Sequence, residues 1–241
     1  MTHLNHALIF AGGTGIRMNT QARPKQFLEL HGKPVLIYTL EHFALHPEID
    51  DITVVCLKDW IPELKRLLKQ YALDKVGRIV PGGERGDVSI YYGLSAMESV
   101  CVSEDIVLIH DGVRPLINAD LITRNIAMVR ERGIAITVEG ASESIVRLGQ
   151  DGQVAEAPPR WETHHVKAPL SFRFGMIWDL YQRAHDEGKA FVDSAQLCAA
   201  YGVQMYTLKS TPNNIKITTP ADYYIFRALF EAMENEQILG L

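Results

Sequence analysis

A glycine-rich turn near the start of the chain is suited to binding phosphate groups. Residues 7–26 read ALIFAGGTGIRMNTQARPKQ, in which an apolar stretch leads through Ala11 into three glycines, Gly12, Gly13 and Gly15. Glycine lets backbone N–H groups approach an anion closely, because no Cβ stands in the way. Arg17 and Lys25 follow and supply one planar and one compact positive charge. The segment therefore predicts nucleotide binding, with an ordinary tight turn as the alternative.

The spacing of this turn argues against two other phosphate-binding motifs. The dinucleotide fingerprint would place a third glycine where Met18 stands, and no Lys-Ser or Lys-Thr pair follows as a P-loop requires. A dehydrogenase is therefore a poor candidate.

A second glycine-containing turn, residues 81–89 with the sequence PGGERGDVS, precedes a predicted helix. Gly82 and Gly83 would present backbone groups, and Ser89 a hydroxyl, to a small planar ligand. The alternative is a plain turn in which Ser89 faces solvent or caps the helix.

An aspartate follows the most apolar predicted strand, in residues 106–115 with the sequence IVLIHDGVRP. Asp111 would lie at the carboxyl end of that strand, where α/β folds bind ligands. Mg²⁺ prefers hard oxygen ligands, usually one or two carboxylates together with substrate phosphates. We therefore predict that Asp111 holds Mg²⁺ against a nucleotide. The alternative is an ion pair with Arg114 that stabilises the turn.

A lysine near the C-terminus completes the set of charged candidates. The segment NIKITTPAD contains a helix start, with Thr219 as the cap, Pro220 in the first turn and Asp222 as the acidic third residue. Asp222 therefore has a structural explanation. Lys216 has none, and we predict that it contacts phosphate.

Strands and helices alternate along most of the chain, which predicts a mostly parallel sheet with helices on both faces. We expect strands at 7–10, 51–57, 78–80, 105–110, 135–139 and 204–208. We expect helices at 34–43, 60–71, 88–99, 120–132, 172–187 and 223–234, and another that begins near Asp193 as its N-cap. Without a linker or internal repeat, residues 1–241 are predicted to form one domain.

The alternation breaks between residues 140 and 169. Two short strand-like stretches, 144–148 and 153–155, flank the turn sequence GQDG, which is typical of a hairpin. Because an isolated hairpin is marginally stable in water, we expect a protruding β-arm that packs on another surface. Within the arm, His164 and His165 are neighbours that would face opposite ways on a strand, so a zinc site there is not expected.

Composition narrows the partners and the compartment. The net charge of −5 offers no general basic field for nucleic acid. No apolar run approaches the ~18 residues of a membrane span, and the first residues do not resemble a signal peptide. Cys56, Cys101 and Cys198 are far apart and lack metal-ligand spacing, so we expect reduced thiols in a cytoplasmic protein.

The motifs AGGTGIRM, PKQFLELHGKPVLIYTLEHF, HDGVRP and NIKITTPAD together resemble the cytidylyltransferases that act on phosphorylated sugar alcohols. The resemblance covers essentially the whole chain and implies a Rossmann-like nucleotidyltransferase fold. It also implies an enzyme that transfers CMP from CTP to a sugar-alcohol phosphate and releases pyrophosphate, with Mg²⁺ as the cofactor. Two branches are similar: the 2-C-methyl-D-erythritol 4-phosphate enzymes of isoprenoid synthesis and the ribitol 5-phosphate enzymes of cell-wall and capsule synthesis.

The resemblance also implies roles for individual residues. Catalytic cations would be Arg17, Lys25 and Lys216. CTP would contact Ala11, Gly12, Gly13, Gly15, Gly82, Gly83, Ser89 and Asp111, the last through the metal. The acceptor would contact Arg114, Ser144, Arg160 and Lys216. In the family the arm is exchanged with a second subunit and completes each active site, which implies a homodimer.

Two departures bear on the acceptor. Ala168-Pro169-Leu170 stands where the family has Thr-Pro-Gln, so a hydroxyl that would contact the acceptor phosphate is missing, and Lys167 is a candidate replacement cation. HDGVRP resembles the ribitol 5-phosphate branch more than the Ala-Ala-Arg of many isoprenoid enzymes. We therefore favour ribitol 5-phosphate over 2-C-methyl-D-erythritol 4-phosphate. A non-catalytic nucleotide-binding regulatory protein is the alternative from another class.

Overall fold

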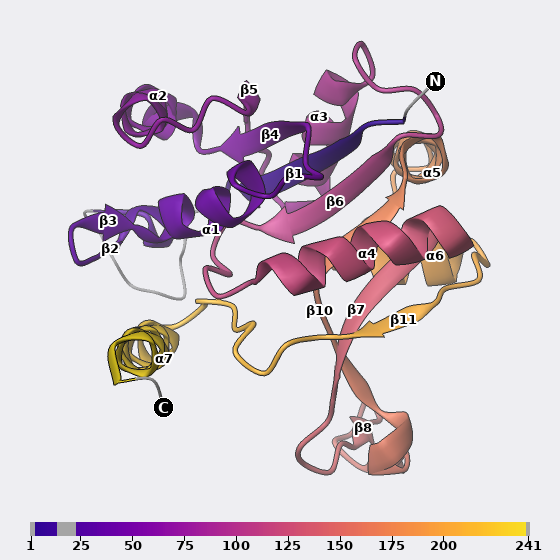
Figure 1. Ribbon diagram of the computed structural model, residues 1–241. Coiled ribbons are helices and arrows are strands. Elements are labelled where there is room, and N and C mark those ends of the chain that lie inside the picture. The colour runs from indigo at the N-terminus through magenta and orange to yellow at the C-terminus, as the bar shows by residue number, and fades with distance from the viewer. Residues whose placement is uncertain (1–2, 14–22, 240–241) are drawn as a thin grey trace.

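The computed structural model describes residues 3–13 and 23–239, which are built around a seven-stranded mixed sheet (Figure 1). The strand order is β11-β7-β10-β6-β1-β4-β5. In chain order the strands are β1 (Asn5–Ala11), β4 (Asp51–Cys56), β5 (Val76–Pro81), β6 (Ile106–Asp111), β7 (Ile134–Gly140), β10 (His164–Arg173) and β11 (Thr207–Lys209). Only β10 runs antiparallel to its neighbours. The predicted mostly parallel α/β sheet is confirmed.

Helices cover both faces of the sheet, as predicted. They are α1 (Val35–Ala44), α2 (Ile61–Gln70), α3 (Gly86–Met97), α4 (Ala119–Arg132), α5 (Phe174–Asp186), α6 (Ser194–Ala200) and α7 (Pro220–Leu239). Each face of the sheet forms its own apolar core with the helices that cover it. Successive side chains of β1 belong to different cores, because they point to opposite faces of the sheet. Ile9 belongs to the core formed with α1, α2 and α4, whereas Leu8 belongs to the core formed with α3, α5 and α6. Within the described residues, no helix has the length and apolar character needed to cross a membrane.

Polar caps fix where two of these helices begin. The Asp193 side chain accepts a hydrogen bond from Gln196 N at 2.8 Å at the start of α6. At the start of α7, Asp222 accepts from Thr219 N at 2.7 Å, and Asp222 N donates to Thr219 Oγ1 at 3.4 Å. This reciprocal arrangement satisfies N–H groups that a helix start leaves unpaired. Both predicted helix starts are confirmed.

Strand β10 corrects the prediction of a helix that begins at residue 172. Phe172 is fully buried in this strand, and α5 begins only at Phe174. A proline in a central strand argues against a strand assignment, since it cannot donate to the ladder. Here Pro169 falls where the register with β7 shifts, between Val166 and Leu170, so the ladder is interrupted at the proline.

The arm leaves the sheet between β7 and β10 and extends away from the body of the molecule (Figure 1). It contains the predicted hairpin, in which β8 (Arg147–Leu148) pairs with β9 (Val154–Glu156). A one-turn helix, η4 (Arg160–Glu162), follows. Residues 164–169, expected in the arm, instead begin β10, and His164 pairs with Gly140 at the end of β7.

Smaller elements complete the description. The strands β2 (Glu29–Leu30) and β3 (Lys33–Pro34) form a two-stranded sheet, and one-turn helices occur at η2 (Lys25–Phe27) and η3 (Lys58–Trp60).

Helix α7 packs through Phe226 against Val35 and Tyr38 of α1. This third apolar cluster also contains Ile217, and so it fixes the segment that carries Lys216.

Candidate active site

The predicted site residues meet at the carboxyl ends of β1 and β6. These strands are parallel neighbours, and their register places Phe10 beside Asp111. A cavity of about 210 Å³ opens here, and its wall comes from both glycine turns, from the end of β6 and from the segment before α7. It is lined by Phe10, Ala11, Gly12, Gly13, Lys25, Gln26, Gly83, Glu84, Arg85, Gly86, Ser89, Asp111, Val113 and Lys216.

The two glycine turns pack directly against each other. A Cβ added at Gly82 would lie 2.9 Å from Gly12 Cα, and one added at Gly12 would lie 3.1 Å from Gly82 Cα. Neither position therefore accepts a side chain without a shift of backbone. Ser89 closes the contact, since its Oγ accepts a hydrogen bond from Gly83 N at 3.1 Å. Ser89 is buried inside α3, so it neither faces solvent nor caps that helix.

Gln26 holds the first turn in place, a role that the sequence analysis missed. Its Nε2 donates to Ala11 O at 2.6 Å and to Gly13 O at 3.2 Å, while the side chain is almost fully buried. These bonds fix the backbone on both sides of Gly12. A single glutamine after Pro-Lys belongs to no helix or strand pattern. Only its position close to the glycine turn could have indicated that Gln26 holds that turn.

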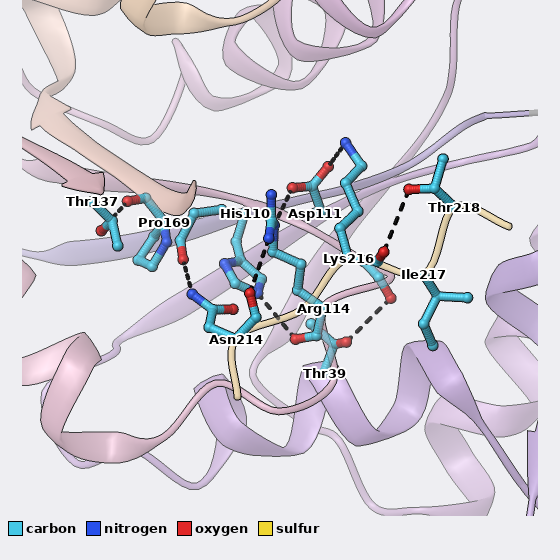
Figure 2. A network of polar contacts seen from close by, with 12 residues as sticks. Thr39, His110, Asp111, Arg114, Thr137, Pro169, Asn214, Lys216, Ile217 and Thr218 are labelled. Carbon is cyan, nitrogen blue, oxygen red and sulfur yellow. Dashed lines mark hydrogen bonds and ion pairs between the residues drawn. The ribbon is translucent and has the colours of Figure 1, made fainter. Parts of the chain in front are cut away.

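Asp111 is the electrostatic centre of the site (Figure 2). It is the last residue of β6 rather than the residue after it, and its carboxylate lies between two cations. Arg114 Nε donates to Oδ2 at 2.7 Å, and Lys216 Nζ lies 2.5 Å from Oδ1. Burial would raise the pKa of Asp111, but the positive charges of Arg114 and Lys216 outweigh it and hold the pKa below the usual aspartate range. The carboxylate is therefore ionised at neutral pH.

Arg114 is fixed by a second layer of contacts. Its Nη1 donates to Asn214 O at 3.1 Å, and Asn214 Nδ2 donates to Ala168 O at 2.6 Å. The Arg114 carbonyl lies 3.3 Å from His110 Nε2. The ion pair with Asp111, considered above as the alternative to ligand binding, is thus present. It does not exclude ligand binding, because both residues also line a cavity.

Lys25 and Lys216 come from distant parts of the chain and meet in the first cavity. Lys25 Nζ donates to Ile217 O at 3.1 Å, and Ile217 N donates to Val113 O at 2.9 Å. These contacts join the segment before α7 to the loop after β6. The Lys216 side chain is 38% exposed, so its ammonium group can exchange one anionic partner for another.

A second cavity of about 230 Å³ lies on the other side of Asp111 and Lys216. It shares four wall residues with the first: Phe10, Gly86, Asp111 and Lys216. The rest of its wall comes from α3, from β6 and the loop after it, from β10, and from the start of α6 with the two residues before it: Ile90, Ile109, Arg114, Val166, Lys167, Ala168, Leu170, Val192, Asp193 and Ser194. Lys167 is only 20% exposed and pairs with Glu139 at 2.8 Å. Two compartments thus meet at one carboxylate and one ammonium group.

Some predicted residues are not brought to this site within one chain. Ser144 and Arg160 are exposed in the arm and line neither cavity, and Arg160 Nη1 donates to Ser142 O at 3.4 Å. Gly82 lies behind the wall and supports it through Gly12. Gly15 and Arg17 lie outside the described residues.

The donor chemistry of Asp111 fits a magnesium ion. Mg²⁺ is commonly held by one or two carboxylates together with substrate phosphates, and Asp111 offers an ionised carboxylate that opens on both cavities. Its Oδ1 is contacted by Lys216, whose partly exposed side chain can move to a phosphate. Asp111 is therefore the residue that would hold the ion.

Comparison with known proteins assigns these features to a family. The family model described as 2-C-methyl-D-erythritol 4-phosphate cytidylyltransferase matches residues 5–232. A ribitol-5-phosphate cytidylyltransferase of Streptococcus agalactiae is 42% identical over 239 residues, which cover 99% of this chain and 100% of the relative. One from Vibrio parahaemolyticus is 42% identical over 238 residues, covering 98% and 100%. A 2-C-methyl-D-erythritol 4-phosphate cytidylyltransferase of Clostridium botulinum is 33% identical over 229 residues, covering 95% and 98%.

A solved structure agrees with the sequence comparisons. The 4-diphosphocytidyl-2C-methyl-D-erythritol synthase of Anaerococcus prevotii superimposes with a TM-score of 0.83 at 27% identity. The match covers 95% of this chain and 99% of that one.

Proposed function

The chain belongs to the 2-C-methyl-D-erythritol 4-phosphate cytidylyltransferase family, and we propose that it transfers CMP from CTP to ribitol 5-phosphate to form CDP-ribitol. The observation that carries the proposal is the junction of two cavities at Asp111 and Lys216. A transfer between two substrates requires their reacting groups to meet, and the shared wall is where occupants of the two cavities would come into contact.

The first cavity is suited to the nucleotide. Backbone at Gly12 and Gly13 approaches the triphosphate without a Cβ, while Gly83 and Ser89, which line the same cavity, would contact the cytosine ring. Lys25 and Lys216 neutralise the phosphates. Glycine turns with cations at the end of a strand form a general anion-binding arrangement.

The reaction needs positioning and charge neutralisation more than a nucleophilic side chain. A phosphate oxygen of the acceptor attacks the α-phosphorus of CTP, the bond from that phosphorus to the bridging oxygen breaks, and pyrophosphate leaves with the electron pair. Lys216 lies between the two cavities, so its ammonium group can stabilise the charge that builds up on the α-phosphate oxygens. A Mg²⁺ ion held by Asp111 would supply Lewis-acid stabilisation of the phosphate oxygens.

The second cavity is suited to the acceptor. Lys167 and Arg114 supply positive charge for its phosphate, and Asp193 and Ser194 supply hydrogen-bonding groups for its hydroxyls. Lys167 stands next to Ala168, where the family threonine is missing, so its ammonium group compensates for the lost hydroxyl contact. Ribitol 5-phosphate is favoured because relatives named for that substrate share 42% identity with the chain, against 33% for the Clostridium botulinum relative named for the other acceptor.

The acceptor 2-C-methyl-D-erythritol 4-phosphate is the second candidate. It is favoured by the description of the matching family model and by the name of the Anaerococcus prevotii structure. It carries a methyl branch, and its shorter chain has one hydroxyl group fewer than ribitol 5-phosphate. The enzyme could therefore react with both acceptors, and the ratio of their kcat/KM values distinguishes the two candidates.

The experiment is a pyrophosphate-release assay with CTP, Mg²⁺ and each acceptor in turn. We expect kcat/KM for ribitol 5-phosphate to exceed that for 2-C-methyl-D-erythritol 4-phosphate by at least ~10-fold, the discrimination that one unpaired polar group provides. The reverse ratio would assign the chain to the second acceptor. Absence of pyrophosphate with both, despite binding of CTP, would leave a nucleotide-binding regulatory protein.

The arm supports a further part of the proposal, a homodimer of cytoplasmic enzyme. It exposes four apolar side chains, Val146, Leu148, Val154 and Trp161. Exposed apolar groups gathered on one protruding arm are typical of an interaction surface. In such a dimer, Ser144 and Arg160 would reach the second cavity of the other subunit.

A further inference from the structure

A cluster of three metal-binding side chains lies apart from the active site. Within the described part of the chain, His6, Cys101 and Asp105 each offer one ligand atom, and these atoms lie within 4.8 Å of one another. His6 is near the amino end of β1, and Asp105 directly precedes β6. Since the active site occupies the carboxyl ends of the same parallel strands, the cluster lies at the opposite edge of the sheet.

The His6 imidazole is oriented as a metal ligand would be. The side chain is 98% buried, with a relative exposure of 2%. Its Nδ1 lies 3.5 Å from Asp51 Oδ2, which Arg78 also contacts. Its Nε2 has no hydrogen-bond partner and faces Asp105, whose Oδ2 is 3.5 Å away. A carboxylate beside one ring nitrogen, and a second ring nitrogen without a hydrogen-bond partner, match the arrangement of a metal-binding histidine.

Asp105 is held in position before any metal binds. Leu4 N donates to its Oδ1 at 2.9 Å, and Val102 N donates to its Oδ2 at 2.9 Å. Each carboxylate oxygen retains a further lone pair. A fourth candidate ligand is near, because His3 Nδ1 lies 4.0 Å from Asp105 Oδ1 on a half-exposed side chain.

We propose that His6 Nε2, the Cys101 thiolate and an Asp105 oxygen bind a zinc-class transition-metal ion, with His3 or water as the fourth ligand. The set of one imidazole, one thiolate and one carboxylate is typical of zinc rather than of Mg²⁺. Tetrahedral Zn²⁺ holds its ligand atoms roughly 3.5 Å apart. His6 Nε2 and Asp105 Oδ2 already have this separation, and the remaining separations, which are within 4.8 Å, would shorten around the ion.

Binding is an exchange of a proton for the metal. The metal forms a bond to the sulfur and the thiol proton passes to solvent, with no change in oxidation state. The thiolate and carboxylate together balance the two positive charges of the ion.

The consequence is structural. The ion would tie the segment at residues 3–6 to the turn between α3 and β6, which contains Cys101 and Asp105. A ligand that binds only the folded state raises thermal stability.

The test is a Co²⁺ titration of chelator-treated protein, followed by absorption spectroscopy. We expect about one equivalent to bind with a thiolate-to-cobalt charge-transfer band and the visible bands of tetrahedral cobalt. Cys101→Ser should remove the charge-transfer band and weaken binding at least ~10-fold, and Asp51→Asn should weaken it by ~10–100-fold through His6. Zn²⁺ should raise the melting temperature of the wild type but not of Cys101→Ser.

Two matched variants make the result specific. Cys198→Ser removes another thiol on the same face of the sheet, and Asp111→Asn removes the carboxylate of the active site. Both should retain the charge-transfer band. The proposal is overturned if wild type shows no such band, if Cys101→Ser retains it, or if Cys198→Ser loses it equally. In those cases His6 would only form ion pairs with Asp51 and Asp105.

Discussion

The Asp111 carboxylate and its two neighbouring cations are the main charges at the junction of the two cavities. One buried carboxylate faces two cations, Arg114 and Lys216, but these cations are held very differently. Arg114 is buried and bonded to the chain at Asn214, whereas Lys216 is partly exposed at the junction of the cavities. Arg114 and Lys216 together keep Asp111 ionised, and in the proposed reaction the partly exposed Lys216 would follow the charge of the reacting phosphate.

Lys216→Met removes the mobile cation while keeping much of the side-chain volume. We expect kcat to fall by about 10²–10³, the usual cost of losing one group that stabilises transition-state charge. The melting temperature should fall only modestly, because Asp111 loses one cation but keeps its ion pair with Arg114. Steady-state kinetics measure kcat, and thermal unfolding measures the melting temperature. Lys209→Met, an exposed lysine on β11, is the control, and equal rates for the two variants would refute the role.

Lys167→Met tests the acceptor cavity separately from the nucleotide cavity. We expect KM for ribitol 5-phosphate to rise by about 10-fold while KM for CTP stays the same, because a single partly buried charge pair is lost. Glu139→Gln is the matched control: it removes the partner of Lys167 but leaves the cation, so KM for the acceptor should not rise. An equal rise in both KM values for Lys167→Met would count against an acceptor-specific role.

Because His110 is buried, we expect the free energy of unfolding to fall in acid. Burial is the main cause that lowers the pKa of His110 to about 3, from an ordinary 6.5. The unfolded chain therefore takes up a proton below pH 6.5 that the folded chain refuses until pH 3, so stability falls across that window. The loss should be about 2 kcal/mol between pH 7 and pH 5. Urea unfolding at both pH values measures it.

The matched comparison uses two histidine substitutions. His110→Asn should lose this part of the pH dependence, while His31→Asn, at an exposed position, should retain it. Indistinguishable pH dependence in the wild type and His110→Asn would contradict the assignment.

At the scale of single residues, the sequence identified most of the described cavity wall. Gly12, Gly13, Lys25, Asp111 and Lys216 were all predicted and all line the first cavity. Glycines that follow a strand, a carboxylate at the end of an apolar strand and lysines without a structural role stand out in a sequence, so these residues could be recognised. Gln26 could not, because its bonds to carbonyl groups depend on how the chain turns back on itself.

Elements were predictable where local signals agree. The caps at Asp193 and Thr219 fixed two helix starts because they act within one turn of the chain. Strand β10 could not be found in the same way. Its place between β6 and β7 depends on partners far away in the sequence, and Pro169 gives the opposite local signal.

The arm is the element whose role is most open to test. If Arg160 acts in the site of the other subunit, mixing two defective variants should restore activity. We expect Lys216→Met and Arg160→Ala to be impaired alone, and their mixture to regain up to about a quarter of wild-type activity, since one site in each heterodimer is intact. Sedimentation would test whether the chain forms the proposed dimer. Activity equal to the mean of the separate variants would show that each subunit completes its own site.

At the scale of the whole molecule, the sheet brings together groups from most of the chain. Lys25 and Lys216 meet because α7 packs against α1 and because Lys25 bonds to the Ile217 carbonyl. The sequence indicated that both lysines bind phosphate, but not that a second cavity adjoins the first. That cavity is built from β10 and the start of α6, and the strand β10 was the element that local signals concealed.

The choice of acceptor is the central claim, and one competition measures it. Equal concentrations of ribitol 5-phosphate and 2-C-methyl-D-erythritol 4-phosphate are mixed with limiting CTP and Mg²⁺, and the products are separated by mass. In a single mixture the product ratio equals the ratio of kcat/KM values. We predict that CDP-ribitol dominates by at least ~10-fold. A dominant CDP-methylerythritol product, or no CDP-alcohol at all, would contradict this account.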